Sequence, residues 1–118
     1  MTKLFIDRRT VLTGMAATLA APAVLRAQNG PIRLGALNPL TGVGGAYGPS
    51  MRDAISGVID AVNANGGILD REIVLISEDT QTSPEAAVRA ARKLIDVDGV
   101  ASIMGTWASS VTTAVAPL

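Results

Sequence analysis

The 118 residues carry ten basic and ten acidic side chains, and they include no cysteine and no histidine. The absence of cysteine excludes disulfides and thiolate chemistry, and the absence of histidine removes the commonest general base and metal ligand. The charge is unevenly distributed, since residues 1–27 are net basic and residues 28–118 are net acidic with scattered arginines. A mildly acidic body of this kind lacks the basic patch that nucleic-acid binding requires.

The first 27 residues have the three parts of an export signal. The pair Arg8-Arg9 is followed by an apolar, alanine-rich run from Val11 to Val24, and Leu25-Arg26-Ala27 places a small residue before Gln28. This order predicts a signal peptide of the twin-arginine type, cleaved after about Ala27. We therefore expect the mature protein to begin near residue 28 and to act in the periplasm.

Two alternatives for this segment remain open. The small residues of Ala21-Pro22-Ala23 form a second possible cleavage box. An uncleaved membrane anchor is less favoured, because a spanning helix needs about 20 apolar residues. The run is shorter than that, and polar, glycine and proline residues interrupt it.

Residues 28–65 predict a strand, a loop and a helix. The strand is Ile32–Asn38, and the glycine-rich loop "PLTGVGGAYGP" follows it. A helix is expected from Pro49 to about Asn65, because proline suits a first turn and asparagine-glycine tolerates the φ values of a helix end. Its apolar side chains recur at the helical period of 3.6. They are Met51, Ala54, Ile55, Val58, Ile59 and Val62.

The second half of the chain repeats this alternation. The stretch "REIVLIS" (71–77) predicts a strand covered on both faces, because its apolar run does not alternate. A helix over 84–97 follows, and Thr82 and Glu85 have capping-box spacing ahead of it. Val100–Met104 predicts a third strand. A last helix is expected to present Val111, Val115 and Leu118 as apolar positions.

The resulting order, β-α-β-α-β-α, predicts an α/β fold with a parallel sheet, helices on its faces and right-handed crossovers. Three strands and an unfinished third helix correspond to only part of a doubly wound domain. In such sheets ligands bind outside the carboxyl ends of the strands. Three loops therefore qualify as candidate sites, namely 38–48, 78–83 and 105–110.

The glycine-rich loop does not match a dinucleotide fingerprint, because Tyr47 occupies the third glycine position. Two interpretations of Tyr47 remain, either that the loop offers it to a ligand or that it packs on the first helix. Glu78 and Asp79 could form a carboxylate pair or a metal site. Adjacent strand residues point to opposite faces, however, so we favour Asp79 capping local backbone and Glu78 facing solvent.

The segment "GTWASS" (105–110) is the strongest candidate. Serine hydroxyls and unpaired N–H groups at a helix start favour an anion such as a carboxylate, and Trp107 could form one wall of a pocket. The alternative is an N-cap serine beside a core tryptophan. The predicted export and the absence of recognisable catalytic residues favour binding.

Several motifs together resemble the N-terminal lobe of type I periplasmic binding proteins, the solute receptors of ABC importers for branched-chain amino acids, amides and urea. The motifs are "PLTG", "AYG", "NANGGI", the "ED" at the end of the second strand, "PEA" and "IMGTWASSVTTAVAP". The resemblance covers about residues 32–118. It implies a doubly wound type I lobe, of which residues 28–118 are a truncated N-terminal part.

The resemblance also implies a function. Ser109 would bind a ligand carboxylate, Ser110 would be the next hydroxyl, and Tyr47 and Trp107 would contribute aromatic walls. The protein would be a non-enzymatic receptor without cofactor, delivering an amino acid or amide-like ligand to importer membrane subunits. An exported enzyme or a ligand-sensing domain on the same lobe is the alternative, because twin-arginine export often serves folded enzymes.

Overall fold

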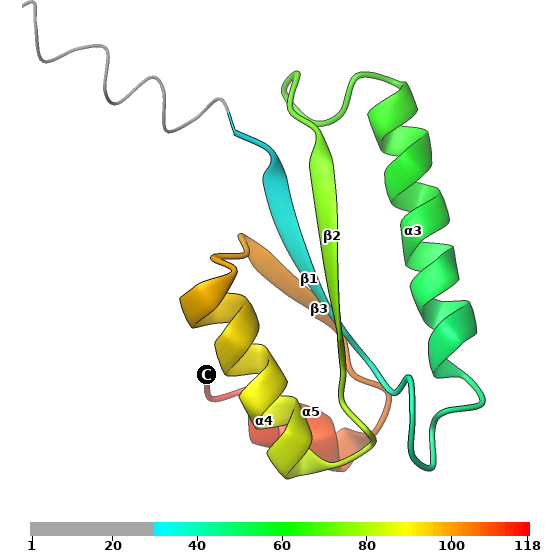
Figure 1. The fold of residues 1–118 in the computed structure, drawn as a ribbon, viewed down its shortest axis with the longest axis vertical. Coiled ribbons are helices and arrows are strands. Elements are labelled where there is room, and N and C mark those ends of the chain that lie inside the picture. The colour runs from blue at the N-terminus through cyan, green and yellow to red at the C-terminus, as the bar shows by residue number, and fades with distance from the viewer. Residues whose placement is uncertain (1–29) are drawn as a thin grey trace, which may run out of the picture. The chain divides into compact units, whose positions relative to one another are not determined.

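The computed structural model describes residues 30–118, so the predicted export signal lies outside the described residues. A parallel three-stranded sheet forms the centre, with the spatial order β2-β1-β3 (Figure 1). Its strands are β1 (Ile32–Asn38), β2 (Ile73–Asp79) and β3 (Ser102–Gly105). The predicted α/β class with parallel strands is confirmed.

Helices cover the two faces of this sheet unequally. They are α3 (Gly48–Ala64), α4 (Pro84–Arg92), the π-helical segment η1 (Lys93–Val97) and α5 (Ser109–Val115). Helix α3 lies on one face, and α4 and α5 lie together on the other (Figure 1). No helix within residues 30–118 combines the length and the apolar character needed to cross a membrane.

The strand register brings the three candidate loops to one edge of the sheet. Asn38 pairs with Asp79 across β1 and β2, and Leu37 pairs with Gly105 across β1 and β3. All three strands therefore finish at nearly the same level. Because they are parallel, the loops that follow them gather at this carboxyl edge.

The hydrophobic core lies between β1 and the helical segment that α4 and η1 form together. Leu37 and Leu94 are fully buried there together with Ala90 and Ala91. Small residues allow the helix to approach closely, and at Gly35 an added Cβ would lie 2.9 Å from Leu94 Cδ1. Burying each leucine contributes roughly 1.5–3 kcal/mol, so this layer anchors the strand that precedes the glycine-rich loop.

The opposite face is only partly covered. Ile59 of α3 is buried, whereas Val58 is 65% exposed. An apolar groove runs between α3 and the sheet, lined by Leu34, Ala54, Ile55, Val58, Ile59, Val62, Ile73 and Met104. The predicted apolar stripe of the first helix thus faces the sheet along one side and borders an open groove along the other.

The C-terminal end of α3 is tied to the start of β2 by one side chain. Asn63 donates from Nδ2 to the Ile73 carbonyl at 2.9 Å and accepts from the Ile73 N–H at 2.8 Å. Gly66 and Gly67 both have positive φ, as the predicted helix end requires. The helix itself begins at Gly48 and ends at Ala64, one residue earlier than predicted at each end.

The helix predicted over 84–97 has the predicted bounds but differs in its N-cap and in its second part. The predicted capping box fails because Ser83 is the N-cap of α4, and its hydroxyl accepts from the Ala86 N–H at 3.4 Å. Thr82 has a left-handed backbone conformation, with φ 55°, and it lies before the N-cap of the helix. The predicted continuous helix over 84–97 changes to π-helix at Lys93, where Asp98 N–H bonds the Lys93 carbonyl.

The outer two strands also differ from prediction. Strand β2 continues to Asp79, and β3 begins at Ser102 rather than Val100 because Val100 N–H bonds the Leu94 carbonyl instead of joining the sheet. Val111 is buried as predicted. Leu118 lies beyond the end of α5 and is 47% exposed, so it is not a core position.

Candidate functional site

The four predicted site residues all lie at the carboxyl edge of the sheet. Tyr47 is the N-cap of α3, Trp107 lies between β3 and α5, and Ser109 and Ser110 begin α5. The two serines and the aromatic residues are exposed or partly exposed. These positions follow directly from the strand register, because each segment leaves the sheet at the same edge.

Tyr47 and Trp107 form a stacked aromatic pair. Their ring centroids are 5.3 Å apart and the planes are inclined by 21°. Tyr47 is 56% and Trp107 45% exposed, so Trp107 is not the core tryptophan considered above. A stack of this kind contributes roughly 0.5–1.5 kcal/mol beyond area burial and leaves the outer ring surfaces open.

The glycine-rich loop approaches the Trp107 indole closely at Gly44. A Cβ on Gly44 would lie 2.9 Å from Trp107 Cε3 and 2.8 Å from Pro39 Cβ. Gly44 is itself buried. A glycine at this position therefore allows the loop and the tryptophan to approach closely.

The serine turn differs from a serine-capped helix. Ala108 is the N-cap of α5, with extended backbone (φ −93°, ψ 133°), so the structure contradicts the alternative of an N-cap serine. Within residues 30–118 the hydroxyls of Ser109 and Ser110 make no hydrogen bond. Both hydroxyls are thus free to donate to a ligand, beside the unpaired N–H groups of the first helical turn.

The hydroxyls of Thr106 and Thr112 lie near this turn but bond each other at 2.6 Å. Gly105 and Thr106 have φ values of 108° and 67°, and the Thr106 N–H donates to the Leu37 carbonyl at 2.8 Å. This turn extends the contact between β1 and β3 beyond the strands. Trp107 and the two serines follow directly after this turn in the chain.

Glu78 and Asp79 point to opposite faces of β2, as predicted. Asp79 accepts hydrogen bonds from the Thr41 N–H at 3.1 Å, the Thr41 hydroxyl at 2.6 Å and the Gln81 N–H at 2.8 Å. Partial burial acts to raise the pKa of Asp79, but hydrogen bonds from Thr41 and Gln81 outweigh it and hold the pKa below the ordinary value of 3.8. The predicted backbone-capping role of Asp79 is confirmed.

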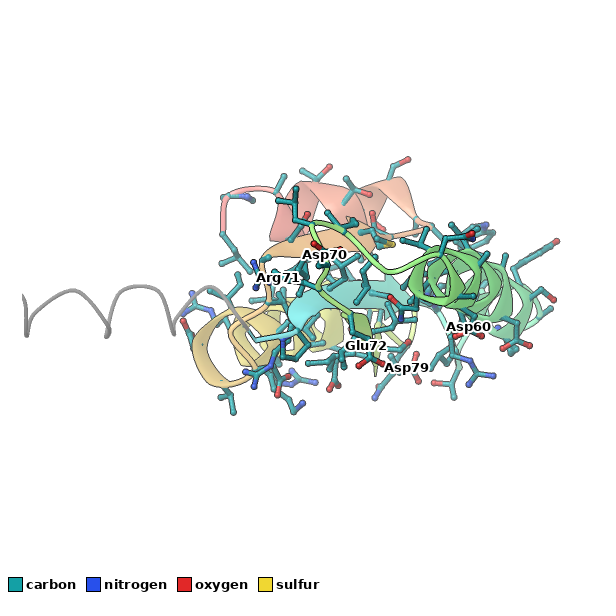
Figure 2. All side chains as sticks on the ribbon, turned by 90° about the horizontal axis from the view of Figure 1, so that it is seen from above. Asp60, Asp70, Arg71, Glu72 and Asp79 are labelled. Carbon is teal, nitrogen blue, oxygen red and sulfur yellow. The ribbon has the colours of Figure 1, made fainter. Side chains whose placement is uncertain are left out.

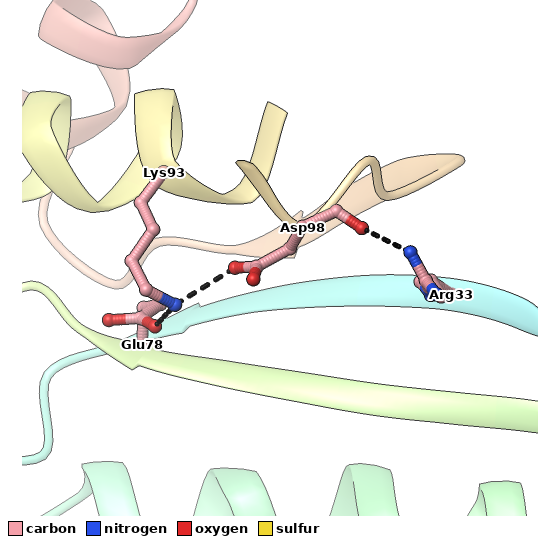
Figure 3. Close-up of polar contacts among 4 residues, drawn as sticks. All are labelled: Arg33, Glu78, Lys93 and Asp98. Carbon is pink, nitrogen blue, oxygen red and sulfur yellow. Dashed lines mark hydrogen bonds and ion pairs between the residues drawn. The ribbon is translucent and has the colours of Figure 1, made fainter. Parts of the chain in front are cut away.

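The expectation that Glu78 faces solvent was wrong. Lys93 Nζ lies 2.7 Å from a Glu78 carboxylate oxygen and 2.9 Å from one of Asp98, and Arg33 donates to the Asp98 carbonyl (Figure 3). Hydrogen bonds to Glu78 and Asp98 raise the pKa of Lys93 above its ordinary value of 10.5. This network joins η1 to the sheet on the face that α4 covers.

The acidic side chains do not converge on a metal site. Figure 2 shows Asp60 on α3, Asp70 and Glu72 on the connection that precedes β2, and Asp79 at the end of that strand. In the part of the chain that the structure describes, no group of three or more acidic side chains is arranged to hold a metal ion.

The sequence did not predict that Thr41 and Thr82 hold the glycine-rich loop. Gly44 N–H donates to the Thr82 hydroxyl at 2.9 Å, and Thr41 binds Asp79 as described above. The glycine-rich loop is therefore held by the β2–α4 turn. The signal available in the sequence was the polar stretch "EDTQTS" at the carboxyl end of a strand, where hydroxyls commonly bond turn backbone.

The sequence matches the family model of the periplasmic binding proteins over residues 31–118. A Leu/Ile/Val-binding protein, BraC3 of Rhizobium johnstonii, is 32% identical over 86% of this chain and 28% of its own length. The chain therefore belongs to the type I periplasmic binding proteins, in the family that includes the branched-chain amino acid binding proteins.

Solved structures agree with this assignment. The substrate-binding protein LivJ of Streptococcus pneumoniae, in complex with isoleucine, superposes with a TM-score of 0.69 at 25% identity, covering 72% of this chain and 24% of LivJ. The leucine-binding protein LivK of Thermotoga maritima superposes with a TM-score of 0.61 at 30% identity, covering 73% of this chain and 24% of LivK. The chain thus spans about a quarter of the length of these relatives.

Proposed function

We propose that this protein is an extracytoplasmic solute-binding receptor, which delivers a small polar ligand to an ABC importer. The ligand would be an amino acid or an amide-like molecule. The observation that carries the proposal is the placement of a stacked aromatic pair and two serine hydroxyls, which have no partner within residues 30–118, at the carboxyl edge of one parallel sheet. The relatives' names, which refer to leucine, isoleucine and valine, support the amino-acid class.

The four site residues have different roles in this proposal. The Ser109 hydroxyl donates to the ligand carboxylate, and Ser110 supplies a second hydroxyl and N–H group. A hydrogen bond to a charged group contributes more than a neutral one, about 1.5–3 kcal/mol. Because α5 has only seven residues, these direct donors rather than a long helix dipole would provide the binding energy.

Tyr47 and Trp107 would bind the less polar part of the ligand. Their stacked rings form one continuous wall, so a ligand group that lies against Trp107 also lies near Tyr47. Such walls are usual in small-molecule sites, where apolar contacts supply area and a few polar groups fix orientation. Neither a cofactor nor a nucleic acid takes part in this proposal.

Membership of the family supports the importer as a partner, and the export signal predicted over residues 1–27 supports the export machinery. The importer membrane subunits would receive the loaded protein in the periplasm, after the twin-arginine export machinery has recognised residues 1–27. Because the chain spans only about a quarter of its relatives, a second lobe would complete the site. The relatives are named for binding and not for catalysis, so the alternative of an exported enzyme is not supported.

A thermal-shift screen of the complete mature protein would test this function. Amino acids, aliphatic amides and urea are the ligands to compare, because each offers a carboxylate or a carbonyl to the serine turn. We expect at least one of them to raise the unfolding temperature in a concentration-dependent way. If none does so, and calorimetry detects no binding at millimolar concentration, the proposal is wrong.

A further inference from the structure

We propose that Asp79 and Thr82 are positioning residues, which hold the glycine-rich loop and thereby fix the orientation of the Tyr47–Trp107 pair. The consequence for ligand affinity rests on the function proposed above. The consequence for the aromatic pair does not rest on that function, because it concerns the conformation of the protein without ligand.

Asp79 holds the near end of the loop. Its two carboxylate oxygens together accept from the Thr41 hydroxyl, the Thr41 N–H and the Gln81 N–H. One side chain thus joins the start of the glycine-rich loop to the turn after β2. These are charge-assisted hydrogen bonds, which are shorter and stronger than neutral ones.

Thr82 holds the middle of the loop. Its hydroxyl accepts from the Gly44 N–H at 2.9 Å and donates to the Thr41 carbonyl at 3.4 Å. Gln81 and Thr82 both have left-handed backbone, with φ values of 52° and 55°. Non-glycine residues adopt this conformation only when surrounding contacts hold them there, and the bonds to the glycine-rich loop supply such contacts.

Gly44 transmits this restraint to the aromatic rings. Its Cα lies against the Trp107 indole, close enough that a Cβ would come within 2.9 Å of Cε3. Its carbonyl accepts from the Tyr47 N–H at 2.9 Å, so the same residue sets the direction in which Tyr47 leaves the loop. Asp79 and Thr82 therefore act on the stack through the backbone of residues 41–44.

The test uses the complete mature protein labelled with 5-fluorotryptophan and measured by fluorine NMR without ligand. The Trp107 resonance is assigned by its loss in Trp107→Phe. We expect Asp79→Ala and Thr82→Val to shift or broaden this resonance. Thr82→Ser keeps the hydroxyl and should leave the resonance at its original position.

Glu78→Gln is the matched control, because Glu78 is the neighbouring acid on the opposite face and bonds Lys93. It should leave the Trp107 resonance unchanged. If Asp79→Ala does not fold, Thr82→Val and Thr82→Ser still give the comparison. A Trp107 resonance that is the same in Thr82→Val and the parent would overturn the positioning role.

Calorimetric titration with L-leucine gives the second readout. We expect Thr82→Val to weaken L-leucine binding about tenfold and Thr82→Ser to bind as the parent does. If the parent does not bind L-leucine while the resonance shifts, the positioning role stands and L-leucine is not the ligand of this protein. If the resonance shifts but affinity is unchanged in Thr82→Val, the aromatic pair does not contact this ligand, and the effect on affinity is overturned.

Discussion

Tyr47 and Trp107, which are far apart in the sequence, stack with ring centroids 5.3 Å apart at the carboxyl edge of the sheet. Tyr47 follows β1 and Trp107 follows β3, and these two strands are direct neighbours. The stack therefore reports the correct order of the strands as well as the shape of the site. Changes in the site can be followed by tryptophan fluorescence and by NMR of a labelled tryptophan, because Trp107 is the only tryptophan of the 118 residues.

Replacing Ser109 with alanine should weaken ligand binding without destabilising the fold. Loss of a charge-assisted hydrogen bond of about 1.5–3 kcal/mol corresponds to a decrease in affinity of roughly 10- to 150-fold. Stability should be unchanged because Ala108, not Ser109, is the helix N-cap. Calorimetry and thermal unfolding of the complete protein measure the two effects. Equal affinity of Ser109→Ala and the parent would exclude this serine from the site.

Replacing Trp107 with alanine should weaken binding by a different mechanism. The variant loses apolar area, so its effect should grow with the size of the ligand side chain at roughly 25 cal/mol per Å² of lost contact. Trp107→Phe keeps an aromatic ring and should retain most of the affinity. Titration of each variant with small and large amino acids gives the comparison. A penalty that is independent of ligand size would argue against a wall contact.

An alanine at position 44 should disturb the aromatic pair. The added methyl group would collide with the indole and with Pro39, and overpacking of this kind costs about 1–3 kcal/mol. We expect a lower unfolding temperature and altered Trp107 fluorescence. Gly57→Ala is the control, since nothing lies within 4 Å of a Cβ there and alanine favours a helix. It should stabilise the protein slightly or leave it unchanged.

Asp79 should make stability depend on pH in the acidic range. Its pKa is lower in the folded protein than the ordinary value of 3.8, so the unfolded state binds the proton more tightly. The carboxylate therefore contributes its full stabilisation above about pH 4, and this is lost as the pH falls through the lower folded pKa. The unfolding temperatures of the parent and Asp79→Asn should differ most near neutral pH and converge in acid. A difference that does not change with pH would contradict this assignment.

The export signal can be tested with the arginine pair. Arg8→Lys together with Arg9→Lys should block translocation, because the twin-arginine machinery distinguishes arginine from lysine at this pair. Arg26→Lys lies outside the pair and should be exported normally. Fractionation of cells followed by detection of the processed protein measures both. Normal export of the double variant would indicate the general secretory route instead.

The local pattern of the sequence determined the order of the strands and helices and carried the resemblance to the family. The bounds predicted for β1, Ile32–Asn38, are those of the structure, with the glycine-rich loop directly after it. The continuous apolar run from Ile73 to Ile76 likewise predicted the second strand. The alternation of strands and helices predicted the parallel sheet, since such connections have one favoured geometry and handedness. These signals lie within short windows of the chain, so the sequence alone was sufficient to find them.

The tertiary structure decided which side chains meet. Thr82 has the spacing of a capping box, yet its left-handed backbone directs its hydroxyl to Gly44. Lys93 lies in a segment with good helical periodicity, yet that segment is π-helical and its ammonium group reaches Glu78. Contacts of this kind form between segments that are far apart in the sequence. The order of the strands in the sheet decides which segments approach one another, and a local sequence pattern does not contain that information.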